Sequence, residues 1–243
     1  MRAVITAGGT VDGEFASEIG TTIKALAPFA SRTLLDVVLD SCAGAGIGEV
    51  AVVGGPAVRA HLRGAGVRVI DAAADGGINV LRALDAWPGE PFAYLSSDLP
   101  FVAADGLRDF IERSGAFAVT MALASAAAYG ARFPGAPPHG VTLRRERIVN
   151  GSAFVLAPGA VAPARALAVR LFEARKSLFA LARLLGPQLC VRFLTRRLAV
   201  ADIEAYGTRV LHLPVSAVRD CDPGLCYDID SLEDYRAACS LRA

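Results

Sequence analysis

The stretch Ala3-Val4-Ile5-Thr6-Ala7-Gly8-Gly9 opens the chain with a short apolar run that ends in a glycine turn. An apolar run bounded by turn residues predicts a buried strand followed by a loop. Further runs of this kind lie at 50–53, 67–70, 92–95 and 116–123. The segments between them that suit helices are 33–43, 57–63, 79–86 and 103–113. This alternation predicts an α/β fold, a Rossmann-like and mostly parallel sheet with helices on both faces.

The second half of the chain departs from this alternation after a Pro- and Gly-rich stretch at 133–138. Apolar runs predict strands at 141–149, 152–156, 210–214 and 227–229. One of the first two is expected to be antiparallel. Helical patterns cover 162–185, with a break near Arg175, and also 199–206 and 231–240. A length of 243 residues fits a single domain spanning residues 1–243.

The overall charge is nearly balanced, with 25 Lys and Arg against 24 Asp and Glu. Such a balance argues against a general electrostatic attraction to nucleic acid or to an anionic membrane. No apolar run reaches the length of a membrane span, and no signal peptide opens the chain. We therefore expect a cytoplasmic protein whose partners are small molecules. The sequence leaves open whether it is a monomer or a homo-oligomer.

Five cysteines are spread along the chain, and only Cys221 and Cys226 lie close together. A zinc site would need two further ligands, and the three histidines are scattered. The cysteines are therefore interpreted as free thiols in a reducing compartment.

The opening loop is the first candidate for chemistry. Gly8 and Gly9 follow the first strand, where exposed backbone N–H groups can approach a phosphate. Lys24, one of only two lysines, ends the loop and could neutralise a phosphate as a point charge. The alternative is a plain turn followed by a surface lysine.

A carboxylate at the end of the fourth expected strand is the second candidate. Asp98 lies where open α/β sheets place their ligands, and a carboxylate there suits Mg²⁺. The alternative is that Asp98 caps the helix that follows. The third candidate is the pair Asp228 and Asp230, whose spacing in an extended segment directs both side chains the same way. Here the alternative is a pair of surface acids.

Two further groups are weaker candidates. Asn150-Gly151-Ser152 is expected to form a turn between two strands, which by itself implies no chemistry. Arg175 and Lys176 lie at an expected helix break. They could hold a phosphate or simply solvate a helix end.

Taken in order, these segments resemble the MobA-like NTP transferase family, which shares its core with the sugar-1-phosphate nucleotidyltransferases and with glycosyltransferase-A-like folds. The similarity runs from the first strand to the last helix and is closest to a less-characterised bacterial branch. The matching stretches are Val4–Gly9, Lys24-Ala25-Leu26, Tyr94–Phe101, Asn150–Phe154 and Tyr227–Tyr235.

The resemblance implies a Mg²⁺-dependent nucleotidyltransferase that transfers a nucleoside monophosphate from an NTP to a small phosphate-bearing acceptor. It implies catalytic roles for Lys24, Asp98 and Asp230, with both aspartates as metal ligands. The implied nucleotide-binding residues are Ala7, Gly8, Gly9, Lys24, Gly76, Gly77 and Asp98. The implied acceptor-binding residue is Asn150, and Arg175 and Lys176 are assigned to the same side as a hypothesis.

One departure from the family pattern matters. Many relatives carry an arginine in the opening loop, but residues 10–18 contain none. The departure keeps a second function open, a non-catalytic nucleotide or nucleotide-sugar binding module. A glycosyltransferase of the same core is a further alternative, which Ser96-Ser97-Asp98 disfavours because such enzymes usually carry Asp-x-Asp there.

Overall fold

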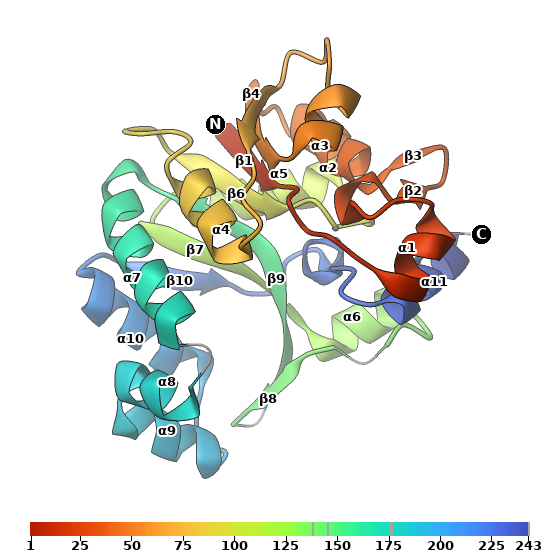
Figure 1. Ribbon diagram of the computed structural model, residues 1–243. Helices are drawn as coiled ribbons and strands as arrows, with labels where there is room; N and C mark the ends of the chain where they lie inside the picture. The colour runs from red at the N-terminus through yellow and green to blue at the C-terminus, as the bar shows by residue number, and fades with distance from the viewer. Residues whose placement is uncertain (138, 145, 175–176, 243) are drawn as a thin grey trace.

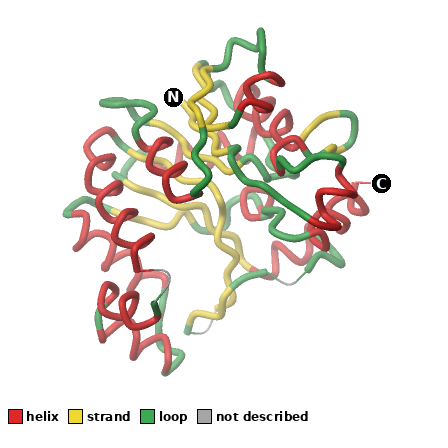
Figure 2. The backbone as a smooth tube through the Cα atoms, in the orientation of Figure 1, coloured by secondary structure: helices red, strands yellow, loops and turns green. Residues whose placement is uncertain are grey.

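The expected sheet forms the centre of the molecule (Figures 1 and 2). The computed structural model describes residues 1–137, 139–144, 146–174 and 177–242. The strand order is β10-β7-β9-β6-β1-β4-β5, with β8 paired to β9. The strands are β1 (Arg2–Thr6), β4 (Glu49–Gly54), β5 (Arg68–Asp71), β6 (Phe92–Ser96), β7 (Val119–Ser125), β8 (Val141–Leu143), β9 (Glu146–Leu156) and β10 (Val215–Val218). A separate two-stranded ribbon joins β2 (Pro28–Phe29) to β3 (Arg32–Thr33).

Most pairs in the sheet are parallel, as expected. β1 runs parallel to β4 and β6, β4 to β5, and β7 to β10. β9 is antiparallel to both β6 and β7 and so supplies the antiparallel strand. β9 lies between the parallel pair β7 and β10 and the parallel strands β6, β1, β4 and β5. It is therefore the neighbour of β6, at whose carboxyl end a ligand is expected.

Helices cover both faces of the sheet. The α-helices are α1 (Gly13–Ile19), α2 (Leu34–Gly44), α3 (Pro56–His61), α4 (Gly76–Leu84), α5 (Ala104–Ser114), α6 (Ala126–Arg132), α7 (Val161–Ala174), α8 (Leu178–Leu185), α9 (Pro187–Leu194), α10 (Val200–Leu211) and α11 (Leu232–Arg242). Ile5 of β1 packs with α2, α3 and α5, whereas Val4 packs with α4 and α7. Successive strand residues point to opposite faces, so one apolar strand serves both layers.

Two expected helix starts are confirmed by their caps. The Thr33 hydroxyl accepts a hydrogen bond from the Asp36 N–H at 3.2 Å, and the Asp36 carboxylate accepts one from the Thr33 N–H at 2.9 Å. Ser231 and Asp234 form the same reciprocal pair at the start of α11. Both pairs satisfy N–H groups that a helix start leaves without partners. No helix in the described part of the chain is long and apolar enough to cross a membrane.

The expected turn at 150–152 is wrong, because β9 runs through it without interruption. A side chain at Gly151 would stand 2.8 Å from the Leu225 carbonyl oxygen and 2.9 Å from Ala122. The glycine therefore allows another segment to pack closely on the strand, which is a common reason for glycine inside a strand.

Two expected strands are also wrong. Residues 210–211 belong to α10, which ends where His212 adopts a left-handed φ of 55°, and the strand begins only at Val215. Residues 227–229 belong to no strand. Tyr227 and Ile229 are fully buried in an aromatic cluster, so their alternation with polar residues reflects packing and not sheet pairing.

Several helices were not expected from the sequence. α1 occupies the opening loop, and α6 and α9 follow β7 and α8. The second helix expected after a break near Arg175 is α8, which begins at Leu178 with Ser177 as its cap. Arg175 and Lys176 themselves lie outside the described residues.

Candidate active site

A cavity of about 310 Å³ opens at the carboxyl ends of β1 and β6. Its walls come from the opening loop, the start of α4 and the end of β6. The lining residues are Thr6, Gly8, Gly9, Thr10, Lys24, Ala74, Gly76, Asn79, Val80, Ser96, Ser97 and Asp98. The glycines, Lys24 and Asp98 of this set are candidates expected from the sequence. The small and polar residues between them carried no distinct sequence signal apart from their position after an apolar run.

The opening loop folds back so that Lys24 lies against Gly9. The Val11 N–H donates to the Thr22 carbonyl oxygen at 2.9 Å, and the Lys24 N–H donates to that of Gly9 at 3.1 Å. A β-carbon at Gly9 would stand 3.6 Å from the Lys24 Cε. These contacts place Lys24 beside the glycine turn.

Gly8 permits a close approach between the loop and α4. A β-carbon there would lie 2.5 Å from the Asn79 Nδ2 and 3.1 Å from the Ala72 Cβ. The Asn79 amide accepts a hydrogen bond from the Ala73 N–H at 2.7 Å and donates one to the Ala73 carbonyl oxygen at 3.0 Å. Asn79 thus holds the segment after β5 beside the glycine turn.

Lys24 lies between two carboxylates. Its Nζ forms an ion pair with Asp98, lies 3.7 Å from the Asp230 Oδ1, and donates to the Ile229 carbonyl oxygen at 2.7 Å. Burial acts to lower the pKa of Lys24, but the attraction of Asp98 and Asp230 outweighs it, and the pKa is raised. The ammonium therefore stays charged.

Asp98 is almost fully buried and is held from both sides. The Ser96 hydroxyl donates to its Oδ1, while Lys24 pairs with its Oδ2. Its carbonyl oxygen accepts a hydrogen bond from the Ile229 N–H at 3.1 Å. The residue that caps α5 is Ala103, so the interpretation of Asp98 as a helix cap is wrong.

The backbone bond to Ile229 brings the second pair of carboxylates to the site. Asp228 accepts a hydrogen bond from the Ser152 hydroxyl at 3.1 Å, and the Asp230 side chain is mostly exposed. Burial raises the pKa of the Asp228 carboxyl, and the charges of Asp230 and Asp98 raise it further. Lys24 therefore pairs with Asp98 and Asp230, and the nearby Asp228 adds a smaller attraction to its ammonium group.

The start of α4 forms the opposite wall. The helix begins at Gly76, three residues earlier than expected, because Asp75 accepts hydrogen bonds from the N–H groups of Gly77 and Ile78. Gly76 lines the cavity, whereas Gly77 packs against the ring of Phe172 from α7. Because the Gly77 and Ile78 N–H groups are already bonded to Asp75, the glycine turn opposite is the part of the cavity wall that can offer backbone N–H groups to an anion.

The family model described as the MobA-like NTP transferase domain matches residues 3–202. The chain belongs to this family. A hypothetical transferase from Thermus thermophilus is 25% identical, with a TM-score of 0.81 over 96% of this chain and 99% of that chain. No curated protein matches the chain significantly.

Two other solved structures share the fold of this MobA-like protein. The 2-C-methyl-D-erythritol 4-phosphate cytidylyltransferase of Thermus thermophilus is 17% identical, with a TM-score of 0.58 over 100% of this chain and 99% of that one. A manganese complex of a Mycobacterium tuberculosis protein is 19% identical, with a TM-score of 0.52 over 98% of this chain and 96% of that one. These neighbours confirm the expected α/β fold, a mostly parallel sheet with helices on both faces.

The other candidate residues of this MobA-like chain lie at different depths. Ala7 is fully buried below the cavity, where its N–H donates to the Val53 carbonyl oxygen at 2.8 Å. Asn150 is exposed on β9, two residues from the Ser152 that binds Asp228. Arg175 and Lys176, the remaining acceptor candidates, fall outside the described residues.

The opening loop, whose residues 10–18 contain no arginine, is held by ion pairs to a distant part of the chain. Arg236 of α11 forms ion pairs with Glu14 and Glu18 of α1, and these bonds lower the pKa of Glu18. The loop is thus anchored to the C-terminal helix. Of the described residues that line the cavity, Lys24 alone is a cation.

Proposed function

We propose that the protein is a nucleotidyltransferase that transfers a nucleoside monophosphate from an NTP to a small phosphate-bearing acceptor, with release of pyrophosphate. The observation that carries the proposal is the placement of Lys24 between Asp98 and Asp230, at the edge of a cavity formed by a glycine turn and a helix start. A binding module would need the N–H groups but not a buried carboxylate paired with a lysine.

The chemistry needs little proton transfer. A phosphate oxygen of the acceptor attacks the α-phosphorus of the NTP, a new P–O bond forms, and the bond to pyrophosphate breaks. Catalysis then rests on positioning and on neutralising negative charge. The N–H groups near Gly8 and Gly9 would hold the phosphates, and Lys24 would turn its ammonium toward them.

The carboxylates suit a divalent metal. No group of three or more His, Cys, Asp or Glu side chains in the described ranges is arranged as a metal site. Mg²⁺ is commonly held by only one or two carboxylates together with substrate phosphates, and Asp98 and Asp230 both lie beside the same ammonium. When bound there, Mg²⁺ would neutralise charge on the phosphates. A fold neighbour was solved as a manganese complex, which supports a divalent metal in a protein of this fold.

The acceptor would approach from the side of β9. Asp228 and Ser152 are bonded to each other there, and Asn150 is exposed on the same strand. The Asp228 carboxyl can accept a hydroxyl hydrogen bond. An acceptor with a hydroxyl near its phosphate would fit this pair.

The first test is thermal unfolding with Mg²⁺ and each of the four NTPs. A ligand at 100 times its Kd stabilises by about 2.7 kcal/mol, which corresponds to roughly 5 to 10 °C for a chain of this length. We expect this shift with at least one NTP in the wild type and its loss in Asp98→Asn. The control is Asp105→Asn, which removes an exposed aspartate of α5 and should behave as the wild type.

Turnover is tested by pyrophosphate release from the NTP that binds, over a panel of phosphate monoesters. Release with one acceptor, lost in Asp98→Asn, would support the transferase. Binding without release over the whole panel would favour the binding module. The absence of any NTP shift would contradict the proposal.

A further inference from the structure

A larger cavity lies on another part of the molecule, between the β8–β9 hairpin and the connection from α9 to α10. Its volume is about 780 Å³. Arg144 lines it from the hairpin, and Arg192, Arg196 and Arg197 line it from the other side. We call it the arginine groove.

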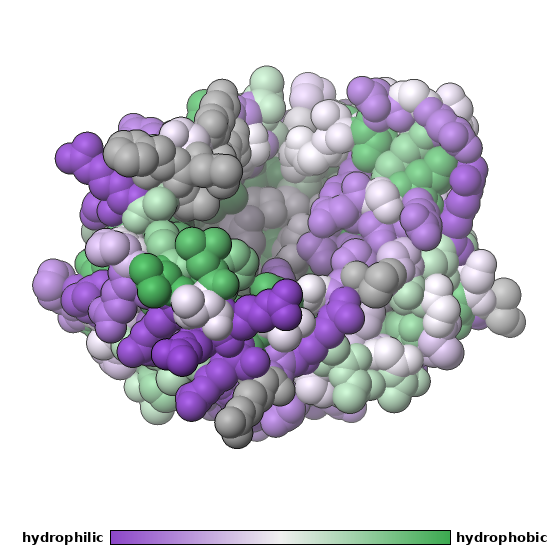
Figure 3. Space-filling model, turned by 90° about the horizontal axis from the view of Figure 1, so that it is seen from below, coloured by the Kyte–Doolittle hydropathy of each residue, from purple (hydrophilic) through white to green (hydrophobic). Residues whose placement is uncertain are grey.

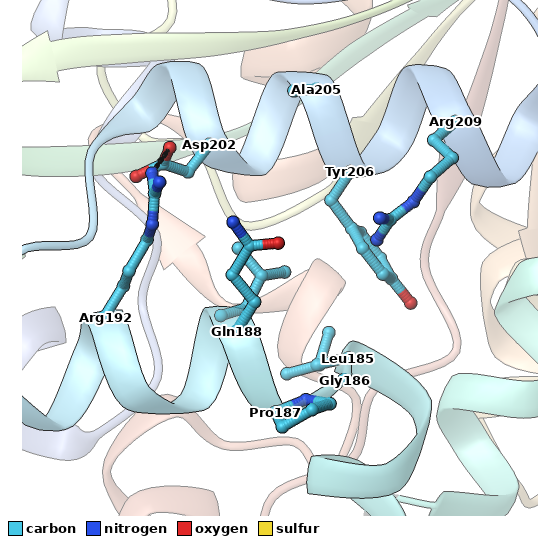
Figure 4. Close-up of a pocket in the computed structure, with 10 residues that line it drawn as sticks. Leu185, Gly186, Pro187, Gln188, Arg192, Asp202, Ala205, Tyr206 and Arg209 are labelled. Atoms are coloured by element: carbon cyan, nitrogen blue, oxygen red, sulfur yellow. Dashed lines mark hydrogen bonds and ion pairs between the residues drawn. The ribbon is translucent and has the colours of Figure 1, made fainter.

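The charge of the arginine groove is far from balanced, although that of the whole chain is close to zero. Its described lining contains four arginines and one acid, Asp202. Asp202 is already paired with Arg192, as Figure 4 shows from the side of the neighbouring cavity between α9 and α10. Arg144, Arg196 and Arg197 are exposed and form no ion pair with any other described residue. Clustered, unpaired cations of this kind create a local positive potential.

The groove is built on a small core of its own. Leu143 and Ile148 of the hairpin pack with Leu198 and Val200 of the α9–α10 connection. The Leu198 N–H also donates to the Arg192 carbonyl oxygen at 2.9 Å, which closes the connection onto α9. Because this core ties the two sides together, the arginines are held around one space.

The backbone gives no local reason for arginine at two of these positions. Arg144 has a φ of 47° and Arg196 a φ of 54°. Leu143 pairs with Glu146, so Arg144, which follows Leu143, lies in the hairpin loop. Glycine and asparagine adopt this left-handed conformation more readily than arginine does. The charge of the side chain therefore accounts for arginine better than the turn does.

Exposed apolar side chains lie next to the arginines. Val191, Phe193 and Leu194 at the end of α9 are 56%, 54% and 79% exposed. Figure 3 shows hydrophobic atoms beside strongly hydrophilic ones on this face, at the rim of a central hollow. A ligand with phosphate groups and an apolar part would meet both kinds of surface.

We propose that the arginine groove binds a ligand that carries two or more phosphate groups. A guanidinium group matches phosphate because it donates two parallel hydrogen bonds, and several arginines favour several phosphates. The groove is separate from the nucleotide cavity. Along β9, Glu146 and Ser152 are six residues apart, which is about 20 Å in a strand. The proposal therefore does not depend on the proposed transferase activity.

The test is calorimetric titration with inorganic tripolyphosphate in the absence of divalent metal. We expect binding to the wild type and a loss of affinity of about tenfold or more in Arg144→Gln/Arg196→Gln/Arg197→Gln, because three charge-assisted contacts are removed. Lys24→Met removes the lining cation of the nucleotide cavity and should leave this binding in place. A control with the same net charge carries Gln at three exposed arginines on other faces, Arg59, Arg63 and Arg165.

The source of the phosphates is distinguished with vesicles of phosphatidylglycerol and phosphatidylcholine. Binding of tripolyphosphate alone would indicate a soluble ligand. Vesicle binding that is lost in the triple variant and weakened by Leu194→Ser would indicate lipid headgroups. The proposal is overturned if neither probe binds, if the triple variant binds both as the wild type does, or if the control loses as much affinity. Circular dichroism of each variant checks that it is folded.

Discussion

Replacing Lys24 with methionine should destabilise the protein measurably. The change keeps the length of the side chain but removes the ammonium from Asp98, whose side chain is only 6% exposed. It also removes the hydrogen bond to the Ile229 carbonyl oxygen, and a bond from a charged donor contributes about 1.5–3 kcal/mol. Asp230 adds little, because its side chain is 72% exposed and lies 3.7 Å away. Breaking a buried pair costs about 3–5 kcal/mol, and the opening of this cavity to solvent places our expectation near the lower end, about 3 kcal/mol.

The assay is urea unfolding of four proteins, namely the wild type, Lys24→Met, Asp98→Asn and the double variant. The free energies of unfolding form a double-mutant cycle, and contacting charges should show a coupling of about 1–3 kcal/mol. Asp230→Asn is the comparison, with an expected change within about 0.5 kcal/mol. Mg²⁺ at ten times its Kd should stabilise the wild type by about 1.4 kcal/mol through the carboxylates.

Additive effects of Lys24→Met and Asp98→Asn would refute the reasoning, since they would mean that the ammonium does not compensate the buried carboxylate. A loss for Asp230→Asn as large as that for Lys24→Met would also contradict it. It would show that the exposed partner carries the interaction.

Three further predictions concern other parts of the structure. Gly8→Ala should cost about 1–3 kcal/mol in unfolding free energy through overlap with Asn79, and additivity with Asn79→Ala would count against this explanation. With a thiol reagent, the exposed Cys239 should react first in the native protein. Burial raises the pKa of the Cys42 thiol to about 12, that of Cys221 to about 11 and that of Cys226 to about 12. Rapid labelling of those three, Cys42, Cys221 and Cys226, would contradict their burial. Burial acts to raise the pKa of Asp36, but hydrogen bonds from His61 and Thr33 outweigh it, and the pKa is lowered from its usual 3.8. The ionised carboxylate therefore stabilises the fold at pH values above 3.8. Its contribution is lost as the pH falls through the lower folded pKa, and Asp36→Asn should flatten that part of a stability–pH curve.

The sequence alone determined the parallel strands in the first half of the chain. Apolar runs such as residues 3–6 must be buried on both sides, and this fixes a strand between two layers of helices. The capping pair of Thr33 and Asp36 was predictable because its bonds join residues only three apart. Gly8 and Asp98 could be selected as candidates because each follows the end of an expected strand, where open α/β sheets bind ligands. Lys24 could be selected because it is one of two lysines and ends the loop after the first strand.

The rest depended on contacts between distant parts of the chain. Gly151 resembles a turn residue until Leu225 is packed against it, and Tyr227 and Ile229 resemble a strand until the aromatic cluster surrounds them. The arginine groove draws its cations from residues about fifty positions apart.

Only the tertiary structure decided which of the candidate site residues form ion pairs with one another. Lys24 and Asp230 are more than two hundred residues apart, and the backbone bond between Asp98 and Ile229 brings them together. Local propensity carries no information about such a pairing. Charge compensation depends on distance and burial, and both are properties of the folded chain.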